Sequence, residues 1–347
     1  MIVRKDGVVL KKEDDNYIKK FGLMKAAEIA IEYKQTHKTP FIHDLFQLAA
    51  FIGPGKRSFF KLLKNVNNEY SFFEIKKKNG GFRKIYAPSP ELCRAQRVIL
   101  RGILSCYDVS PYASAYIEGK GLISNAQPHT NKKYILKMDI TDFFGSISFE
   151  QVISTVFNKN YFPSAVGYAL TTLCCYKGYL VQGAPTSPMI SNLVLKHFDD
   201  VMGVWCEKRG ISYSRYCDDI TFSANEPLFC AYSKAKAFLS EMGFEINKKK
   251  TRFVSHTSQQ NVTGLVVNEK VSVPKEYKRD LRQKIYYFLK FDKKDTAFKQ
   301  SGREYYSYIN YLLGRANYVL SIEPNDKFLK ESILVLREKS DVEYWNE

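Results

Sequence analysis

Two adjacent aspartates interrupt a run of strand-forming residues, RYCDDITFS, at positions 215–223. The flanking aromatic and β-branched residues favour extended structure, whereas Asp218 and Asp219 disfavour it and repel each other. The run therefore predicts a strand, a tight turn and a second strand, with both acids where the strands meet. Because side chains alternate along a strand, we expect Asp218 to share a face with Tyr216 and Asp219 to point elsewhere.

A second acidic segment, ILKMDITDFFGSI, ends a predicted strand at residues 134–139 with Asp139. An isolated Asp-Asp pair is usually a solvated turn, but here the acids interrupt strands and a further acid ends another strand. Two such sites that meet on one sheet could hold two divalent cations ~3.5–4 Å apart, which stabilise the attacking and leaving oxygens of phosphoryl transfer. Hard oxygen ligands of this kind suit Mg²⁺.

The charge balance of the chain favours a polyanionic partner. Lys and Arg number 53 against 36 Asp and Glu, which gives a formal net charge of +17 and points most often to nucleic acid. The chain has no run of 18 apolar residues and no signal-peptide pattern at its start, so we expect no membrane association and a cytoplasmic location. Seven cysteines without a CxxC pair argue against a zinc site or a disulfide framework.

Hydrophobic periodicity predicts a mixture of helices and short, hairpin-connected strands, which is typical of the α+β class. Residues 70–88 read as two strands joined at Asn79-Gly80-Gly81, a hairpin signal. Ser148 and Gln151 form a capping box that predicts a helix start. Further helices are predicted within 17–66 and over 90–107, 165–176, 188–209, 228–242 and from 275 onward, with further short strands at 244–247, 252–257 and 261–267.

Five segments, in the same order along the chain, together resemble the motifs of reverse transcriptases. They are RKIYAP (83–88), KMDITDFF (137–144), VQGAPTSPMISNL (181–193), YCDD (216–219) and GFEINKKKT (243–251). Two more, NAQPH (125–129) and VTG (262–264), resemble elements of the bacterial retron reverse transcriptases. Cys217 stands where alanine is common in bacterial relatives, and we expect the turn to tolerate this small residue.

The resemblance implies a right-hand polymerase fold of the α+β class. Its parts would be an N-terminal helical extension (1–68), fingers (69–133), a palm with some interleaved fingers elements (134–268) and an RNA-binding thumb (269–347). The implied reaction is RNA-directed DNA synthesis from deoxynucleoside triphosphates, with two Mg²⁺ ions that Mn²⁺ can replace.

The same resemblance implies the partners. The template would be a cognate structured noncoding RNA, primed by the 2′-hydroxyl of an internal guanosine. The product would be a branched RNA–DNA hybrid, the msDNA of retrons. Retrons commonly act in defence against phage together with an effector protein encoded nearby.

The resemblance also assigns the catalytic residues. Asp139 and Asp218 would be the main metal ligands, with Asp219 assisting and the backbone carbonyl of Ile140 as a further ligand. Lys250 matches the lysine that can protonate the leaving pyrophosphate. It lies in a run of three lysines, and the sequence leaves open which of them faces the site.

The nucleotide site follows in the same way. Phe144 would pack under the sugar and exclude a ribose 2′-hydroxyl; the alternative is that Phe143 and Phe144 both belong to the core. Gln182 and Gly183 would lie against the nascent base pair, where glycine permits close backbone approach, unless the segment is an ordinary loop before a helix.

A basic hairpin would complete the nucleotide site. In residues 70–88, Arg83 would bind the triphosphate with Lys77 or Lys78 nearby, because a forked guanidinium suits phosphate oxygens. The alternative for such a charged run is a solvated strand edge.

Residues 270–303 carry 11 Lys or Arg against 4 Asp or Glu, interleaved with aromatic residues. Exposed rings can stack on bases and the cations can pair with phosphates, although tyrosines at helical spacing are more often core. The segment resembles the thumb, which in retron enzymes holds structured template RNA. The implied RNA contacts are Lys278, Arg279 and Arg282, together with Asn125, His129 and Thr263.

Two other functions fit parts of the pattern. One is another bacterial reverse transcriptase class, such as a diversity-generating, CRISPR-associated or abortive-infection enzyme, against which the 125–129 and 262–264 elements argue. The other is a non-catalytic RNA-binding protein that keeps only the fold. The intact acids at 139, 218 and 219 argue against the second.

Overall fold

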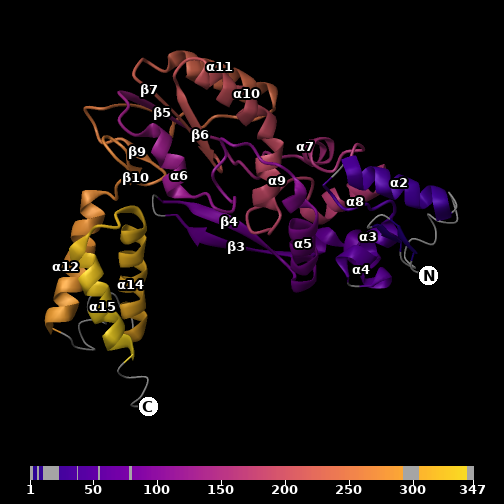
Figure 1. Ribbon diagram of the computed structural model, residues 1–347, viewed down its shortest axis with the longest axis horizontal. Coiled ribbons are helices and arrows are strands. Elements are labelled where there is room, and N and C mark those ends of the chain that lie inside the picture. Colours follow the sequence, from indigo (N-terminus) through magenta and orange to yellow (C-terminus); the bar gives the residue numbers. More distant parts are fainter. Residues whose placement is uncertain are drawn as a thin grey trace.

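A four-stranded antiparallel sheet with the strand order β6-β7-β5-β8 lies at the centre of the fold (Figure 1). Strand β5 (Tyr134–Asp139) pairs with β7 (Asp219–Ala224) on one side and with β8 (Arg252–Ser255) on the other. Strand β6 (Ser212–Tyr216) pairs with β7 in a tight hairpin. The computed structural model describes residues 3–5, 8–10, 23–36, 38–53, 55–77, 80–291 and 305–341.

The two faces of this sheet differ in polarity. On one face Tyr213 and Phe222 lie in the main hydrophobic core, where Phe198 of α10 (Lys196–Glu207) packs against Tyr213. Phe198 also packs against α11 (Phe229–Glu241), so both helices cover this face. The opposite face carries the acids, because alternation places every second residue of β5 and β7 there.

A second antiparallel pair forms the predicted hairpin, with β3 (Tyr70–Lys76) and β4 (Phe82–Pro88) joined near Gly80 and Gly81. Both glycines have positive φ, which is the conformation that such a short connection requires. Helix α5 (Pro90–Gly102) follows directly, and its N-terminus is capped by the Ser89 hydroxyl.

Most of the remaining helices that precede β6 gather at the end of the molecule farthest from the C-terminus (Figure 1). The capping box of Ser148 and Gln151 starts α7 as predicted. The helices that precede β6, apart from α5 and α10, are α2 (Leu23–Thr36), α3 (Leu45–Ile52), α4 (Lys56–Lys64), α6 (Leu122–Ala126), α7 (Phe149–Thr155), α8 (Ser164–Cys174) and α9 (Ser187–Val194). The 3₁₀ turns in the same part of the chain are η2 (Val66–Asn68), η3 (Leu104–Cys106) and η4 (Gln127–His129).

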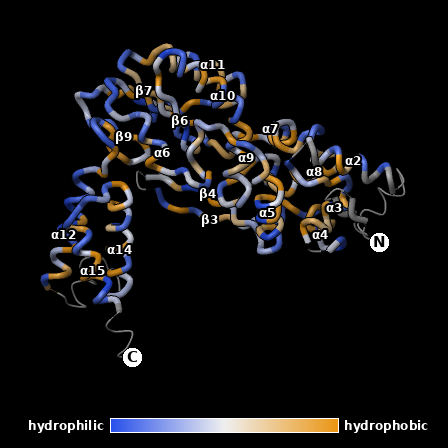
Figure 2. The backbone as a smooth tube through the Cα atoms, in the orientation of Figure 1, coloured by the Kyte–Doolittle hydropathy of each residue, from blue (hydrophilic) through white to orange (hydrophobic). Residues whose placement is uncertain are grey.

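Three helices near the C-terminus form a separate bundle at the opposite end of the molecule from α2 (Figure 1). They are α12 (Lys275–Phe291), α14 (Tyr305–Ile322) and α15 (Lys327–Asp341). Their buried side chains form a second core, which also includes Ala126 and Ile135. Hydrophilic and hydrophobic stretches alternate along α12, as an amphipathic helix requires (Figure 2).

Three local features differ from the sequence-based expectations. The helix predicted over 188–209 is two helices, α9 and α10, separated at Leu195. Residues 244–247 form no strand, and only a single bridge joins Ile246 to Ile140. Two short paired strands, β1 (Val3–Lys5) and β2 (Val8–Leu10), lie in the segment expected to be helical.

A two-residue turn at Thr263 and Gly264 joins the short strands β9 (Asn261–Val262) and β10 (Leu265–Val266), which lead from the sheet to the bundle. Among the helices in the described ranges, none combines the length and the apolar character that crossing a membrane would require.

Candidate active site

Three carboxylates meet at one end of the central sheet. Asp139 is the last residue of β5 and lies directly across from Asp219, the first residue of β7. Asp218 occupies the turn between β6 and β7, where its carbonyl accepts a hydrogen bond from the Ile140 amide at 3.2 Å. The fold therefore brings the two acidic segments of the sequence together.

The turn itself corrects one expectation. Tyr216 is the cross-strand partner of Asp219, so these two side chains share a face and Asp218 belongs to the turn. The prediction that Tyr216 shares a face with Asp218 is wrong, because strand alternation does not extend through a chain reversal of two residues. Cys217 has φ 59°, a left-handed conformation that is uncommon for a residue with a side chain.

The electrostatics of the cluster favour a bound cation. Burial raises the pKa of Asp218, and the nearby charge of Asp139 raises it further. Burial and the charge of Asp218 raise the pKa of Asp219 to about 6. A positive charge among these side chains would relieve the repulsion between them and stabilise their ionised forms.

Lys250 supplies one such charge. Its Nζ lies 2.7 Å from Asp139 Oδ2, and this hydrogen bond raises the pKa of the lysine. The side chain of Asn247 accepts hydrogen bonds from the Lys249 and Lys250 amides, and the Asn247 amide donates to the Asp139 carbonyl at 2.8 Å. These contacts fix the lysine run against β5, and Lys250 is the member that reaches the acids.

The donor set fits a hard divalent ion that arrives with its substrate. Within the residues that the structure describes, no three acidic, thiol or imidazole side chains form a ready-made metal cage. Mg²⁺ does not require one, because it commonly uses one or two carboxylates and fills its shell with water and substrate phosphates. Asp139, Asp218 and Asp219 provide hard oxygen donors of this kind at the sheet end.

A loop before α9 packs closely against the β3–β4 hairpin. The Gln182 carbonyl accepts a hydrogen bond from the Tyr86 amide at 2.8 Å. Gly183 has φ 117°, and a Cβ there would lie 2.4 Å from the Tyr86 carbonyl oxygen and 3.1 Å from the Ile85 side chain. A side chain at position 183 would therefore push the loop away from β4, so this approach depends on glycine.

Arg83 lies two residues before Ile85 on β4, so the two side chains share a face of the strand. Since Ile85 contacts Gly183, the exposed Arg83 is directed to the loop side of the hairpin. Lys77 is exposed at the end of the hairpin, and Lys78 lies outside the described residues.

Phe144 lies in the main core and is 8% exposed. Its ring packs 5.4 Å from that of Phe143, which in turn contacts Phe244. Both phenylalanines therefore pack in the core, and Phe144 is the more exposed of the two.

Comparison with known proteins decides the family. The family model described as "Reverse transcriptase (RNA-dependent DNA polymerase)" matches residues 75–278, more than half of the chain. The chain is 35% identical over 233 residues to the retron Ec86 reverse transcriptase of Escherichia coli, a match that covers 65% of this chain and 72% of that protein. This chain belongs to the retron reverse transcriptases.

Two other retron reverse transcriptases agree with this assignment. The retron Ec83 reverse transcriptase of Escherichia coli is 31% identical over 271 residues, covering 74% of this chain and 83% of that protein. The retron Mx65 reverse transcriptase of Myxococcus xanthus is 33% identical over 232 residues, covering 61% and 54%. Among solved structures, telomerase from Candida albicans in complex with a telomeric RNA fragment is 12% identical with a TM-score of 0.44, covering 97% of this chain and 73% of that chain.

Membership confirms the predicted activity and fold. A retron reverse transcriptase is an RNA-directed DNA polymerase with a right-hand polymerase fold, and it binds an RNA template. Reverse transcriptases use divalent metal ions, which agrees with the donor set at the sheet end.

Two residues expected to contact RNA lie inside the retron reverse transcriptase instead. His129 is fully buried against the face of the sheet opposite α10 and α11, with its ring nitrogens 2.7 Å from Ser223 Oγ and 2.8 Å from Ser214 Oγ. Burial lowers the pKa of His129 to about 3, so the ring is neutral. Asn125 is also buried and donates to Thr263 Oγ1 at 3.4 Å. Direct RNA contact by His129 and Asn125 is thus a wrong prediction, because both side chains are enclosed by protein.

The cations expected to hold RNA in the retron reverse transcriptase lie on α12, but they differ in their contacts. Lys278 forms an ion pair with Glu323, and Arg282 forms one with Asp326. Arg279 is exposed and forms no such ion pair with a described residue. An open groove of about 740 Å³ runs along this surface. It is lined by Lys275, Lys278, Arg279, Arg282, Gln283, Tyr286, Tyr287 and Phe328.

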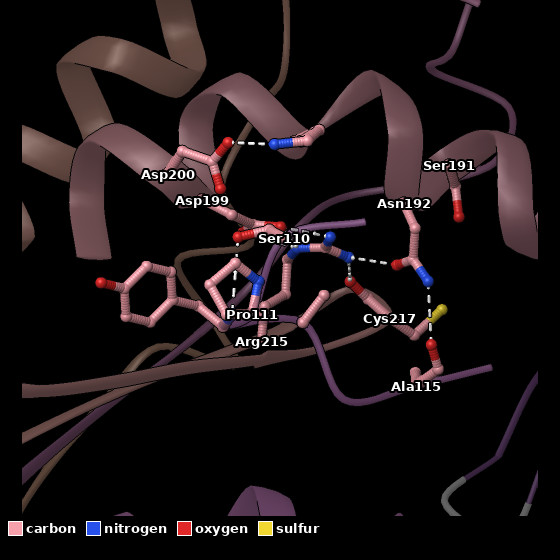
Figure 3. A network of polar contacts seen from close by, with 12 residues as sticks. Ser110, Pro111, Ala115, Ser191, Asn192, Asp199, Asp200, Arg215 and Cys217 are labelled. Carbon is pink, nitrogen blue, oxygen red and sulfur yellow. Dashed lines mark hydrogen bonds and ion pairs between the residues drawn. The ribbon is translucent and has the colours of Figure 1, made fainter. Parts of the chain in front are cut away.

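Sequence reasoning missed a polar network beside the turn that carries Asp218 in the retron reverse transcriptase (Figure 3). Arg215 and Asp199 are fully buried and form an ion pair, and Asn192 is buried beside them. The sequence feature that could have indicated this network is the position of Arg215. It lies two residues after Tyr213 on β6, so its charged side chain shares the face that packs on the core and needs a buried partner.

Proposed function

We propose that this retron reverse transcriptase copies a cognate structured noncoding RNA into a single-stranded DNA that stays linked to the RNA. Priming from the 2′-hydroxyl of an internal guanosine would give the branched msDNA product. The observation that carries the proposal is the meeting of Asp139, Asp218 and Asp219 at one sheet end, with Lys250 paired to Asp139.

In this proposal Asp139 and Asp218 hold two Mg²⁺ ions, with Asp219 assisting and the Ile140 carbonyl as a further ligand. When bound, the ions polarise the attacking hydroxyl and neutralise charge on the leaving phosphate oxygens, and Mn²⁺ can replace them. Lys250 would donate a proton to the leaving pyrophosphate, and its ion pair with Asp139 beside the other acids supports this role.

The nucleotide site extends from the acids to the hairpin. We propose that Gln182 and Gly183 lie under the nascent base pair and that Arg83, with Lys78 nearby, binds the triphosphate. The close packing of the loop on β4 supports this arrangement, because it joins Gly183 and Arg83 on one side of the hairpin.

Phe144 is proposed as the residue that excludes ribonucleotides. Its ring packs against Phe143 in the core, and the residue is 8% exposed. Phe144→Val should raise incorporation of ribonucleotides relative to deoxynucleotides, because the smaller side chain leaves room for a 2′-hydroxyl. Single-nucleotide extension with each substrate measures this ratio, and an unchanged ratio would place the selection elsewhere.

The division into an extension (1–68), fingers (69–133), palm (134–268) and thumb (269–347) is part of the same proposal. The thumb would grip the template RNA and the RNA–DNA hybrid through Lys278, Arg279 and Arg282, and Thr263 would contact RNA near its base.

The test is to express the gene with its flanking DNA and to extract nucleic acid. Wild type should yield a short single-stranded DNA that shifts in size after RNase treatment, and an Asp218→Asn/Asp219→Asn variant should yield none. Asp108→Asn, an acid at a surface ion pair, is the matched control and should behave as wild type.

The same strains test the partners. We propose that an effector protein encoded nearby acts with this enzyme in defence against phage, so plaque counts should rise in the double variant. If wild type yields no DNA in cells but extends a generic primed RNA, the retron product is wrong and another reverse transcriptase class is favoured. A fully active double variant would refute the catalytic assignment.

A further inference from the structure

The turn that carries Asp218 is held from behind by a buried arginine (Figure 3). Arg215 Nη1 donates to the Cys217 carbonyl at 3.0 Å and to Asn192 Oδ1 at 3.1 Å. Its Nε and Nη2 donate to the Asp199 carboxylate at 2.5 to 3.0 Å. The Asn192 amide nitrogen donates to the Ala115 carbonyl at 2.8 Å, which fixes its orientation.

This network is costly, which calls for a reason beyond packing. Arg215, Asp199 and Asn192 are all fully buried. Removing an ion pair from water costs several kcal/mol per ion, and well-packed apolar side chains of similar volume are often at least as stable. A role in stability alone therefore does not account for the pair.

The conformation of the turn supplies that reason. Cys217 is held at φ 59°, although left-handed backbone is unfavourable for a residue with a side chain. Such conformations persist only where the surroundings over-determine them, and they concentrate at functional sites. The guanidinium provides this restraint, because it binds the carbonyl of Cys217 while Asp199 and Asn192 hold it in place.

We propose that Arg215 is a positioning residue for polymerisation. Clamped by Asp199 and Asn192, it fixes the Cys217 carbonyl and so sets where Asp218 and Asp219 stand relative to Asp139. The inference rests on the proposed catalytic role of these three acids.

The network also ties the turn to the nucleotide loop. Asn192 lies on α9, the helix that follows the Gln182–Gly183 loop, so the same guanidinium contacts α9 and the catalytic turn. Arg215 therefore links the helix that follows the loop to the turn that carries the acids.

Arg215→Lys tests the proposal. Lysine keeps the charge and can pair with Asp199, but its single ammonium lacks the planar fork that reaches three acceptors at once. Leu48→Ala is the control, because it removes a fully buried side chain from α3, away from the turn, and should destabilise the protein to a comparable extent.

Three quantities are measured on each variant: the midpoint of thermal unfolding, the affinity for Mn²⁺ alone by electron paramagnetic resonance, and kcat and KM on a primed RNA template. We expect Arg215→Lys to lower kcat by about tenfold or more, since small misplacements of catalytic groups have effects of this size. Mn²⁺ affinity should fall several-fold in the same variant. Leu48→Ala should keep both values while its unfolding midpoint falls.

Unchanged kcat and Mn²⁺ affinity in Arg215→Lys would overturn the proposal and leave the arginine a structural residue. If Arg215→Lys fails to fold, Asn192→Ser replaces it, because it removes one acceptor of the guanidinium and leaves the ion pair. It should lower kcat and Mn²⁺ affinity in the same direction, and normal values would equally overturn the proposal. Asp218→Asn is run in parallel, and activity in that variant would refute the catalytic assignment rather than the role of Arg215.

Discussion

Asp219 is the acid whose protonation depends most clearly on its surroundings. Its carboxyl is partly buried and faces the charge of Asp218, which together raise its pKa to about 6. In the metal-free protein this acid is strained when ionised, because neither water nor a cation compensates its charge fully. Binding of a divalent ion would relieve that repulsion and stabilise the ionised form of the acid.

The effect of this ionisation on the free energy of unfolding has a direction that Asp219→Asn can test. The folded pKa near 6 lies above the unfolded value near 4, so the protonated acid stabilises the fold fully below about pH 4. That contribution is lost as the pH rises through about 6. In EDTA, Asp219→Asn should therefore raise the free energy of unfolding at pH 7.5 by about 1–3 kcal/mol, with little gain below pH 4.

Urea unfolding at both pH values measures the difference between the variant and wild type. A gain of equal size at both pH values would show that the charge of Asp219 is not its cause.

At the level of single residues, the sequence predicted the meeting of the three acids better than it predicted burial. Asp139, Asp218 and Asp219 could be predicted because each acid breaks a local strand pattern. Nothing local marked His129 as enclosed, because the Ser214 and Ser223 hydroxyls that surround it come from strands far along the chain.

Among the elements, the β3–β4 hairpin was predictable and its orientation was not. Alternating residues and an Asn-Gly-Gly connection fixed the pairing of the strands. Which face meets the active site follows only from the contact between Ile85 and the position of Gly183. Likewise, residues 188–209 contain no proline after position 188 and no glycine before 203 to mark the break between α9 and α10.

The hairpin offers a matched pair of substitutions. Arg83 and Lys84 are neighbouring exposed cations on β4 that point to opposite faces. Arg83→Ala should raise KM for deoxynucleotides several-fold with a smaller effect on kcat, because it removes a phosphate contact made on binding. Steady-state extension at varied nucleotide concentration measures both constants.

Lys84→Ala serves as the control and should keep KM near that of wild type. Equal effects of the two substitutions would indicate a general loss of positive charge and would contradict a specific role for Arg83.

At the scale of the whole molecule, the three α12 cations proposed to bind RNA differ in whether an acidic side chain pairs with them. Lys278 and Arg282 form ion pairs with Glu323 and Asp326, respectively. In the described part of the chain, Arg279 forms no such pair and lines the open groove of the three-helix bundle. Arg279 is therefore the better placed of the three for a phosphate.

Arg279→Ala should weaken binding to a structured RNA and lower the slope of log affinity against log salt by about 1, because one phosphate contact is lost. Filter binding over a range of salt concentrations measures both. Lys38→Ala, at a surface ion pair with Asp108, should leave the slope unchanged. The same slope in Arg279→Ala and wild type would place the RNA on another surface.

The order of the sequence motifs was enough to predict the polymerase fold, because each motif is a short local pattern and the family match confirms their arrangement. The network around Arg215 could not be predicted, because its partners Asp199, Asn192 and Ala115 come from separate elements. Only the folded chain shows that Lys250, rather than Lys248 or Lys249, pairs with Asp139.

The core of the three-helix bundle is not closed within the bundle, since it extends to Ala126 and to Ile135 on β5. A chimera that exchanged only the C-terminal helices between relatives would cut through this core and leave voids against the strand that ends in Asp139. An exchange of these helices would therefore need side chains at positions 126 and 135 that match the new bundle, so the three helices and β5 form one packing unit.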